Sequence, residues 1–345
     1  MTGEIATDRD VADEARSETG ATFDAAGAIT RLVVVTPVYE DRAASASLFR
    51  ELAAVFGERL FVVAVDDGSV REPVDPSALA GANVTGTVIT LRRNVGHQRA
   101  IAIGLSYVAA DLAGSDRLVV MDCDGEDVPR SIVELLGAEA PDVDVVVAER
   151  RGRVETLRFR LFYQLYKFLF WLLSGRKIGF GNFMAMKPSA AKRLAAMNEL
   201  WIHAAACVLT SKLRVATCPV DRGPRYADRS KMNFSGLALH GFRGLMVFAE
   251  DVLLRVGIAC AFVAAFCVLA SVAAVFLKLN GFATPGWFSV ALGVLFIVFL
   301  QTGAITLIAL LFTGVMRGAS ATVADYREFI GEIRHVERTH ASVAR

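Results

Sequence analysis

The sequence predicts an α/β domain with a mostly parallel sheet, followed by two helices that cross a membrane. Three observations support this fold class. Runs of β-branched residues alternate with longer helical stretches between residues 30 and 150, as in parallel sheets covered by helices. Two later segments lack charged residues over lengths that span a bilayer. Finally, 54% of the 345 residues are hydrophobic, yet 37 basic and 36 acidic residues require a soluble part of ordinary size.

Composition excludes several classes of protein. The net charge of +1 argues against a protein that coats nucleic acid, so we expect no nucleic-acid partner. The five cysteines form no CxxC pair, which argues against a disulfide framework or a zinc site and favours a reducing compartment. Residues 1–28 are rich in acidic side chains and contain no apolar segment of a signal peptide. We therefore predict a disordered acidic tail there.

The α/β domain is expected to cover residues 29–235. Its strands are expected at 32–35, 60–65, 87–91, 117–121 and 144–148, and helices at 43–56, 97–113 and 129–138. Ligands of such sheets bind beyond the carboxyl ends of the strands. The segments found there are TPVYED (36–41), DDGS (66–69) and DCD (122–124). Neither GxGxxG nor GxxxxGK[ST] occurs, so the sequence supports no dinucleotide fingerprint and no P-loop.

Residues 253–315 are predicted to form two transmembrane helices joined by a short turn. One charge-free run covers residues 256–277 and a second covers residues 279–316. Basic residues flank the pair on its two outer sides, whereas only Lys278 lies at the turn. The positive-inside rule therefore places the soluble domain and both termini in the cytoplasm, with residues 316–345 as a cytoplasmic tail.

Two further segments are expected to lie on the membrane surface. Residues 157–173 are rich in Leu and Phe, but three basic residues fall within them and they are short for a span. This pattern fits an amphipathic helix in the headgroup region, with an internal core helix as the alternative. Residues 236–252 are predicted to form a second, juxtamembrane amphipathic helix. Basic residues around the first segment make anionic membrane lipids an expected partner.

Four acidic residues lie within six positions directly after a predicted strand: Asp122, Asp124, Glu126 and Asp127. Carboxylates that converge repel one another unless a cation joins them, and a site with only oxygen ligands suits Mg²⁺ or Mn²⁺. The alternative is a solvated acidic turn that caps the next helix. A metal at the end of a strand would bridge the phosphates of a nucleotide-diphosphate compound and neutralise the leaving diphosphate.

These motifs resemble glycosyltransferase family 2 and, within it, the polyprenyl-phosphate glycosyltransferases. The resemblance covers about residues 30–315, and the order and spacing of the motifs carry it, because each motif alone is weak. The motifs are TPVYED (36–41), VDDGS (65–69), NVGHQRAIAIGL (94–105), MDCDGEDVP (121–129), ERRGR (149–153), GFGNFMAM (179–186) and RYADRSK (225–231). The resemblance implies a GT-A fold and the inverting, metal-dependent transfer of a sugar to a polyprenyl phosphate.

The resemblance also implies roles for individual residues. Asp124 and Glu126 would bind the metal, although Glu126 stands where the family usually has Gln. The residues expected in catalysis are Asp122, Asp124, Asp127, Arg225 and Lys231. Those expected to bind the nucleotide sugar or its phosphates are Pro37, Tyr39, Asp41, Asp67, Asp122, Cys123, Arg150, Arg225, Ser230 and Lys231. Of these, Asp67 would hold the base and Arg150 would meet phosphate.

Partners and location follow from the same resemblance. It implies a multi-pass protein of the bacterial inner (plasma) membrane, suggests a homotetramer, and favours a UDP-sugar over a GDP-sugar as donor. The sugar itself is left open. The alternatives are a processive polysaccharide synthase, a transferase to another lipid acceptor, and a membrane scaffold that binds nucleotide sugars without catalysis. The synthase is disfavoured because no QxxRW motif occurs and two spans cannot readily enclose a channel.

Overall fold

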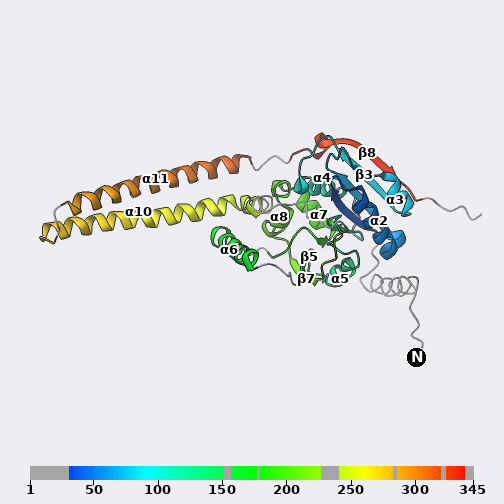
Figure 1. Cartoon of the computed structure of the whole chain (residues 1–345), viewed down its shortest axis with the longest axis horizontal. Helices are drawn as coiled ribbons and strands as arrows, with labels where there is room; N and C mark the ends of the chain where they lie inside the picture. The colour runs from blue at the N-terminus through cyan, green and yellow to red at the C-terminus, as the bar shows by residue number, and fades with distance from the viewer. Residues whose placement is uncertain are drawn as a thin grey trace, which may run out of the picture. The chain divides into compact units, whose positions relative to one another are not determined.

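The computed structural model describes residues 31–150, 157–176, 179–226, 241–282, 286–319 and 324–338. The chain divides into two compact units, whose helices and strands are drawn in Figure 1. The first unit takes in residues 1–156, 178–247 and 323–345, and the second takes in residues 157–177 and 248–322. The predicted tail of residues 1–28 lies outside the described residues.

The first unit is built on a sheet whose strands follow the order β7-β5-β6-β4-β1-β2-β3-β8. Strands β4, β1, β2 and β3 run parallel, as do β5 and β7, whereas β6 and β8 are antiparallel to their neighbours. The predicted α/β class with a mostly parallel sheet is therefore confirmed. The strands are β1 (Leu32–Val38), β2 (Leu60–Asp66), β3 (Thr85–Leu91), β4 (Arg117–Val120), β5 (Val145–Arg150), β6 (Met184–Met186), β7 (Val215–Val220) and β8 (Ile330–Val336).

Helices cover both faces of this sheet, and each face has its own apolar core. Successive residues of β1 alternate between the two cores, since Val34 packs in one and Val33 and Val35 in the other. Burial on both faces explains why the strands are continuous apolar runs. One face carries α2 (Arg42–Phe56), α3 (Pro76–Gly81) and α5 (Ser131–Gly137); the other carries α4 (His97–Ala109), α7 (Pro188–Ala195) and α8 (Ala204–Thr210). Short 3₁₀ turns occur at Gly57–Arg59, Asn198–Trp201 and Tyr326–Phe329.

The edge strand β8 comes from a part of the chain that the sequence placed outside the α/β domain. Residues 316–345 were predicted to be a tail, whereas Ile330–Val336 pair antiparallel with β3. The ring of Phe329 lies 5.5 Å from that of Trp201, and the backbone N–H of Arg92 donates to the carbonyl of Phe329 at 3.0 Å. The segment IGEIRHV carries charges and little apolar surface, as edge strands do, so its sequence gave a weak strand signal.

The second unit contains α6 (Leu157–Ser174), α10 (Ala249–Leu279) and α11 (Trp287–Ala319). Helices α10 and α11 run antiparallel (Figure 1), and each is long and apolar enough to cross a membrane. Most of their large apolar side chains are exposed, whereas the buried residues Cys267, Ala274 and Ala309 are small. Small residues between helices and apolar residues outside are typical of helices packed in lipid. Both helices extend beyond the predicted limits of 253 and 315.

The two predicted surface helices are described in part. Helix α6 exists as expected, with Phe168, Trp171 and Leu172 exposed and Phe170 buried. The ring of Phe170 meets that of Phe248 edge to face at 5.7 Å, which packs α6 against the start of α10. Of residues 236–252, residues 241–246 are helical, and α10 already begins at Ala249. The position of either segment at a membrane surface stays a prediction.

Candidate active site

The carboxyl ends of β4, β1 and β2 lie side by side at one edge of the sheet, because these strands are adjacent and parallel. The residues that follow them bring acidic groups to this edge. Residues 39–41 follow β1, Asp67 follows β2, and residues 122–127 follow β4 shortly after its last residue. The sequence placed the ligand site at the same edge, as expected for parallel α/β sheets.

Asp67 is buried directly after β2 and holds the backbone of the residues that precede α4. Its Oδ1 accepts the backbone N–H of Val95 at 2.7 Å, and its Oδ2 accepts that of Gly96 at 2.9 Å. Burial raises the pKa of Asp67, although these two N–H groups act in the opposite direction. Both carboxylate oxygens therefore have backbone partners, and the expected contact of Asp67 with a nucleotide base stays a prediction.

The segment after β1 contains an acidic residue that the sequence had not singled out. The carboxylate of Glu40 accepts backbone N–H groups of Val70, Arg71 and Glu72 at 2.7 to 3.0 Å. These hydrogen bonds lower the pKa of Glu40 and hold the loop after β2 against the end of β1. Next to Glu40, the ring of Tyr39 is exposed, whereas Pro37 is buried in β1. Asp41 occupies the N-cap position of α2, but its side chain accepts no capping hydrogen bond.

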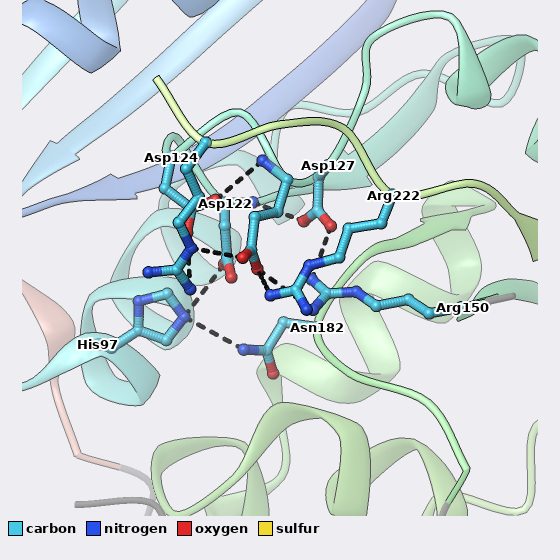
Figure 2. Close-up of polar contacts among 9 residues, drawn as sticks. His97, Asp122, Asp124, Asp127, Arg150, Asn182 and Arg222 are labelled. Carbon is cyan, nitrogen blue, oxygen red and sulfur yellow. Dashed lines mark hydrogen bonds and ion pairs between the residues drawn. The ribbon is translucent and has the colours of Figure 1, made fainter. Parts of the chain in front are cut away.

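Asp122 faces the first residue of α4 (Figure 2). His97 Nε2 lies 3.2 Å from Asp122 Oδ1 and 3.1 Å from Asn182 Nδ2. Desolvation lowers the pKa of His97, but the charge and hydrogen bond of Asp122 and the charges of Asp67 and Asp127 together outweigh it, so the pKa of His97 is raised. Sequence reasoning gave His97 and Asn182 no role, because only the fold brings them to Asp122. The available signal was the place of His97 at a helix start that follows a predicted strand.

Asp127 is buried and connects the acidic loop after β4 to the end of β5. Its Oδ2 accepts the backbone N–H of Asp122 at 2.9 Å, and its Oδ1 accepts a hydrogen bond from Arg150 Nη2 at 2.9 Å. Burial, followed by the nearby charge of Asp122, raises the pKa of Asp127. With both oxygens engaged, Asp127 shapes the acidic loop and orients Arg150. Its expected part in catalysis stays a prediction.

Three arginines of the described ranges contact Glu126, and we call them the arginine cluster: Arg150, Arg222 and Arg225 (Figure 2). Arg150 ends β5, and the other two lie in the loop after β7. Arg150 Nη1 lies 3.5 Å from Glu126 Oε2, which Arg222 Nη2 also contacts, while Arg225 Nε donates to Oε1. Burial raises the pKa of Glu126, but the hydrogen bonds and the charges of Arg225 and Arg222 together outweigh it, so the pKa is lowered.

Several predicted phosphate-binding residues can now be placed. Arg150 and Arg225 come together as members of the arginine cluster, although 75 positions separate them in the chain. Arg222 joins them, and sequence reasoning had given it no individual role. Ser230 and Lys231 lie outside the described residues.

The donor set fits a divalent cation that is shared with a substrate. Asp122 and Asp124 offer carboxylate oxygens of the kind that such a cation prefers, and Cys123 between them is buried. Burial and then the charge of Asp122 raise the pKa of Asp124, a repulsion that a cation would relieve. Within the described ranges, no three His, Cys, Asp or Glu side chains form a metal-binding group. A cation here would take its other ligands from phosphate and water, as Mg²⁺ commonly does. Glu126, the other predicted ligand, contacts the arginine cluster.

Comparison with known proteins identifies the domain that holds most of this site. Residues 33–200 match the sequence model of the family described as Glycosyl transferase family 2. Residues 33–200 are a family 2 glycosyltransferase domain. The family predicted from the motifs is therefore confirmed. The acidic loop, His97, Arg150 and Asn182 lie inside this family 2 domain, whereas Arg222 and Arg225 follow it in the chain.

Curated relatives share part of the chain. The undecaprenyl-phosphate 4-deoxy-4-formamido-L-arabinose transferase of Salmonella paratyphi A is 28% identical over 162 residues, which are 46% of this chain and 48% of that protein. The enzyme of the same name from Enterobacter sp. (strain 638) is 31% identical over 136 residues, covering 37% and 39%. The chain thus matches about half the length of these relatives or less.

Some solved structures also resemble this chain. Glucosyl-3-phosphoglycerate synthase from Mycobacterium tuberculosis, in complex with Mn²⁺, uridine diphosphate and phosphoglyceric acid, is 15% identical with a TM-score of 0.48. The similarity covers 69% of this chain and 82% of that one. A second complex of the same synthase, with Mn²⁺, uridine diphosphate and glucosyl-3-phosphoglycerate, is 17% identical with a TM-score of 0.45 and covers 69% and 83%.

Proposed function

We propose that the protein transfers a sugar from a nucleotide-diphosphate sugar to a polyprenyl phosphate such as undecaprenyl phosphate. One observation carries the proposal: the carboxylates of Asp122 and Asp124 and the arginine cluster meet at one edge of a family 2 sheet. Such a site suits a donor and an acceptor that both carry phosphate. Relatives named as undecaprenyl-phosphate transferases and two membrane-length helices support a lipid acceptor.

The chemistry requires little proton transfer. A phosphate monoester is already anionic at neutral pH, so the acceptor needs no strong general base, unlike a sugar hydroxyl. One of its oxygens forms a bond to the anomeric carbon from the side opposite the diphosphate. The bond from that carbon to the diphosphate oxygen breaks, and the nucleoside diphosphate leaves with the electron pair. The anomeric configuration is inverted.

The chain's own residues reduce the repulsion between two phosphate-bearing substrates. Guanidinium groups of the arginine cluster offer paired N–H donors that match phosphate oxygens. Mg²⁺ or Mn²⁺ held by Asp122 and Asp124 would neutralise the leaving diphosphate. The exposed ring of Tyr39 is suited to contact the nucleotide. We take a UDP-sugar as the favoured donor because the motifs resemble those of bacterial undecaprenyl-phosphate enzymes.

The same proposal gives the protein a location. We place it in the bacterial inner membrane, with α10 and α11 as spans and the family 2 domain and both termini in the cytoplasm, since the basic residues flank the outer ends of the pair. A homotetramer stays a prediction from the resemblance.

A transfer assay tests the reaction. Membranes that contain the protein are incubated with undecaprenyl phosphate, Mn²⁺ or Mg²⁺ and a panel of radiolabelled UDP- and GDP-sugars, and lipid extracts are counted. We expect label in the lipid fraction from one donor. Asp124→Asn should abolish the transfer, whereas the matched control Asp142→Asn, at an exposed acid outside the site, should retain it. Labelling of diacylglycerol in place of undecaprenyl phosphate, or of no lipid from any donor, would overturn the proposal.

A further inference from the structure

Glu126 is the carboxylate that all three guanidinium groups of the arginine cluster contact. Its side chain is only 9% exposed, and both of its carboxylate oxygens meet guanidinium groups. The four side chains together carry three positive charges and one negative charge. A carboxylate and a phosphate present similar oxygens to arginine, so each can satisfy the same N–H donors. Glu126 therefore stands where a substrate anion would stand.

The loops that carry these groups are held together by their backbones. The N–H of Gly223 donates to the carbonyl of Glu126 at 3.0 Å, and the N–H of Tyr226 donates to the carbonyl of Asp124 at 3.0 Å. Gly125 has a φ of +89°, and a Cβ built there would lie 2.9 Å from the carbonyl oxygen of Pro224. The acidic loop and the loop of Arg222 and Arg225 thus approach closely for reasons independent of the Glu126 charge. A change of that charge alone should leave the two loops in place.

The contacts of Glu126 disfavour its predicted role as a metal ligand. Its oxygens face guanidinium groups, and those positive charges would repel a divalent cation at the same place. The carboxylates of Asp122 and Asp124 belong to the same acidic loop: Asp122 Oδ1 lies 3.2 Å from His97 Nε2, and Asp124 Oδ2 lies 3.5 Å from Arg225 Nη2. We therefore expect Asp122 and Asp124 to bind the cation, whereas Glu126 pairs with the arginines.

We propose that Glu126 is an internal counter-anion, which holds the arginine cluster in position until a phosphate group of a substrate displaces it. The role rests on the proposed transfer between phosphate-bearing substrates. It makes Glu126 a positioning residue with two effects. Without substrate, Glu126 offsets part of the positive charge of the cluster and holds the three guanidinium groups together. During binding it competes with the incoming phosphate, so the affinity for that phosphate is lower than the arginines alone would give.

The size of the competition follows from the occupancy of the cluster. If the arginines are free of Glu126 for about one tenth of the time, the apparent dissociation constant for phosphate is about ten times the intrinsic one. Glu126→Gln removes the negative charge but keeps a side-chain oxygen as acceptor. We therefore expect the variant to bind its phosphate ligand about tenfold more tightly than the wild-type protein.

Calorimetric titration of the full-length protein in detergent tests this expectation, in phosphate-free buffer without divalent cations and at constant ionic strength. The probes are UDP, for the diphosphate of the donor, and a short-chain prenyl monophosphate, for the acceptor. The matched control is Glu139→Gln, because the side chain of Glu139 is 10% exposed, close to the 9% of Glu126, and pairs with an arginine, Arg117 at 2.8 Å, away from the site. We expect tighter binding of at least one probe by Glu126→Gln and unchanged binding by Glu139→Gln. Tighter binding of UDP alone assigns the cluster to the donor, and tighter binding of the monophosphate alone assigns it to the acceptor.

Two further measurements test the proposal: the phosphate affinity of Glu126→Asp and the Mn²⁺ affinity of Glu126→Gln. Glu126→Asp keeps the charge but withdraws it by one methylene, so its affinity should lie between those of the wild type and Glu126→Gln; this variant also serves if Glu126→Gln fails to fold. Unchanged or weaker binding of both probes by a variant with wild-type circular dichroism would overturn the proposal. So would a loss of Mn²⁺ affinity in Glu126→Gln with unchanged phosphate binding, since that result would make Glu126 a metal ligand. No titration requires sugar transfer, so failure of the transfer assay would leave these results standing.

Discussion

Arg150 Nη2 donates to Asp127 Oδ1 at 2.9 Å and thereby joins the end of β5 to the acidic loop after β4. Asp127 is almost completely buried, and its other oxygen accepts the backbone N–H of Asp122. The position of Asp122 therefore depends on a carboxylate that is itself held by Arg150. This relationship links the stability of the domain to the geometry of its candidate site.

Replacement of Arg150 tests that link. Arg150→Gln leaves the buried carboxylate of Asp127 without its cation, and loss of one partner of a buried pair typically costs about 3 kcal/mol of unfolding free energy. We expect a clear fall in the midpoint of thermal unfolding, measured by fluorescence in detergent, together with loss of sugar transfer. Because Asp127→Asn removes the stranded charge, the double variant Asp127→Asn/Arg150→Gln should recover part of the stability. Simple additivity of the two single changes would contradict a coupled pair.

Metal removal gives a second prediction. Asp122 and Asp124 are crowded carboxylates whose repulsion a cation relieves, and a diphosphate leaving group needs its charge neutralised. EDTA should therefore abolish sugar transfer, and added Mn²⁺ or Mg²⁺ should restore it in the wild type. In Glu126→Gln the restoration should remain, whereas in Asp124→Asn it should fail at every metal concentration. Full transfer in the presence of EDTA would contradict metal dependence.

The close approach of two loops gives a third prediction. A Cβ at Gly223 would clash with the carbonyl oxygen of Gly125, and Gly125 has a φ of +89°, which side chains rarely adopt. Gly125→Ala and Gly223→Ala should each lower stability by about 1 to 3 kcal/mol and reduce transfer, because strain separates Arg222 and Arg225 from the acidic loop. The control is Gly137→Ala, since nothing lies within 4 Å of its Cβ position. Equal effects at Gly137 and Gly223 would contradict the packing argument.

The sequence predicts the sheet edge better than the site built on it. Strands β1 and β2 are buried on both faces, so their β-branched runs identify them and the acids that follow. By contrast, two of the residues that contact Glu126 are Arg222 and Arg225, which lie about a hundred positions further along the chain. No local pattern specifies that approach. The contact of His97 with Asp122 is hidden for the same reason.

The pairing of β8 with β3 leads to a fourth prediction. Phe329 precedes β8, and its ring packs against that of Trp201 with the centroids 5.5 Å apart and the ring planes tilted by 40°. This contact anchors the segment before β8 to the core beside α4. Phe329→Ala should cost about 2 kcal/mol, less than full burial of a Phe would give, because the ring is only half-buried. Ile333→Ala, at a residue 38% exposed on β8 itself, should cost under about 1 kcal/mol. Thermal unfolding of the full chain measures both, and an equal or reversed order would count against a role for Phe329 as an anchor.

Asp144 and Arg214 give a prediction for pH. Arg214 Nη2 lies 2.8 Å from Asp144 Oδ1, and both Nε and the backbone N–H of Arg214 donate to Oδ2, which ties the starts of β5 and β7 together. These hydrogen bonds lower the pKa of Asp144 from 3.8 to about 2. A carboxyl with a lowered folded-state pKa adds stability that is fully present above pH 3.8 and is lost as the pH falls towards 2.

Arg214 is exposed, so solvent limits the effect of the Asp144–Arg214 pair to about 2 °C in the unfolding midpoint. Asp144→Asn should therefore unfold about 2 °C below the wild type at pH 6, and the two midpoints should converge as the pH falls from 4 to 2, as should those of Arg214→Gln. A difference that is constant across this range would show that the pair does not contribute through ionisation of Asp144.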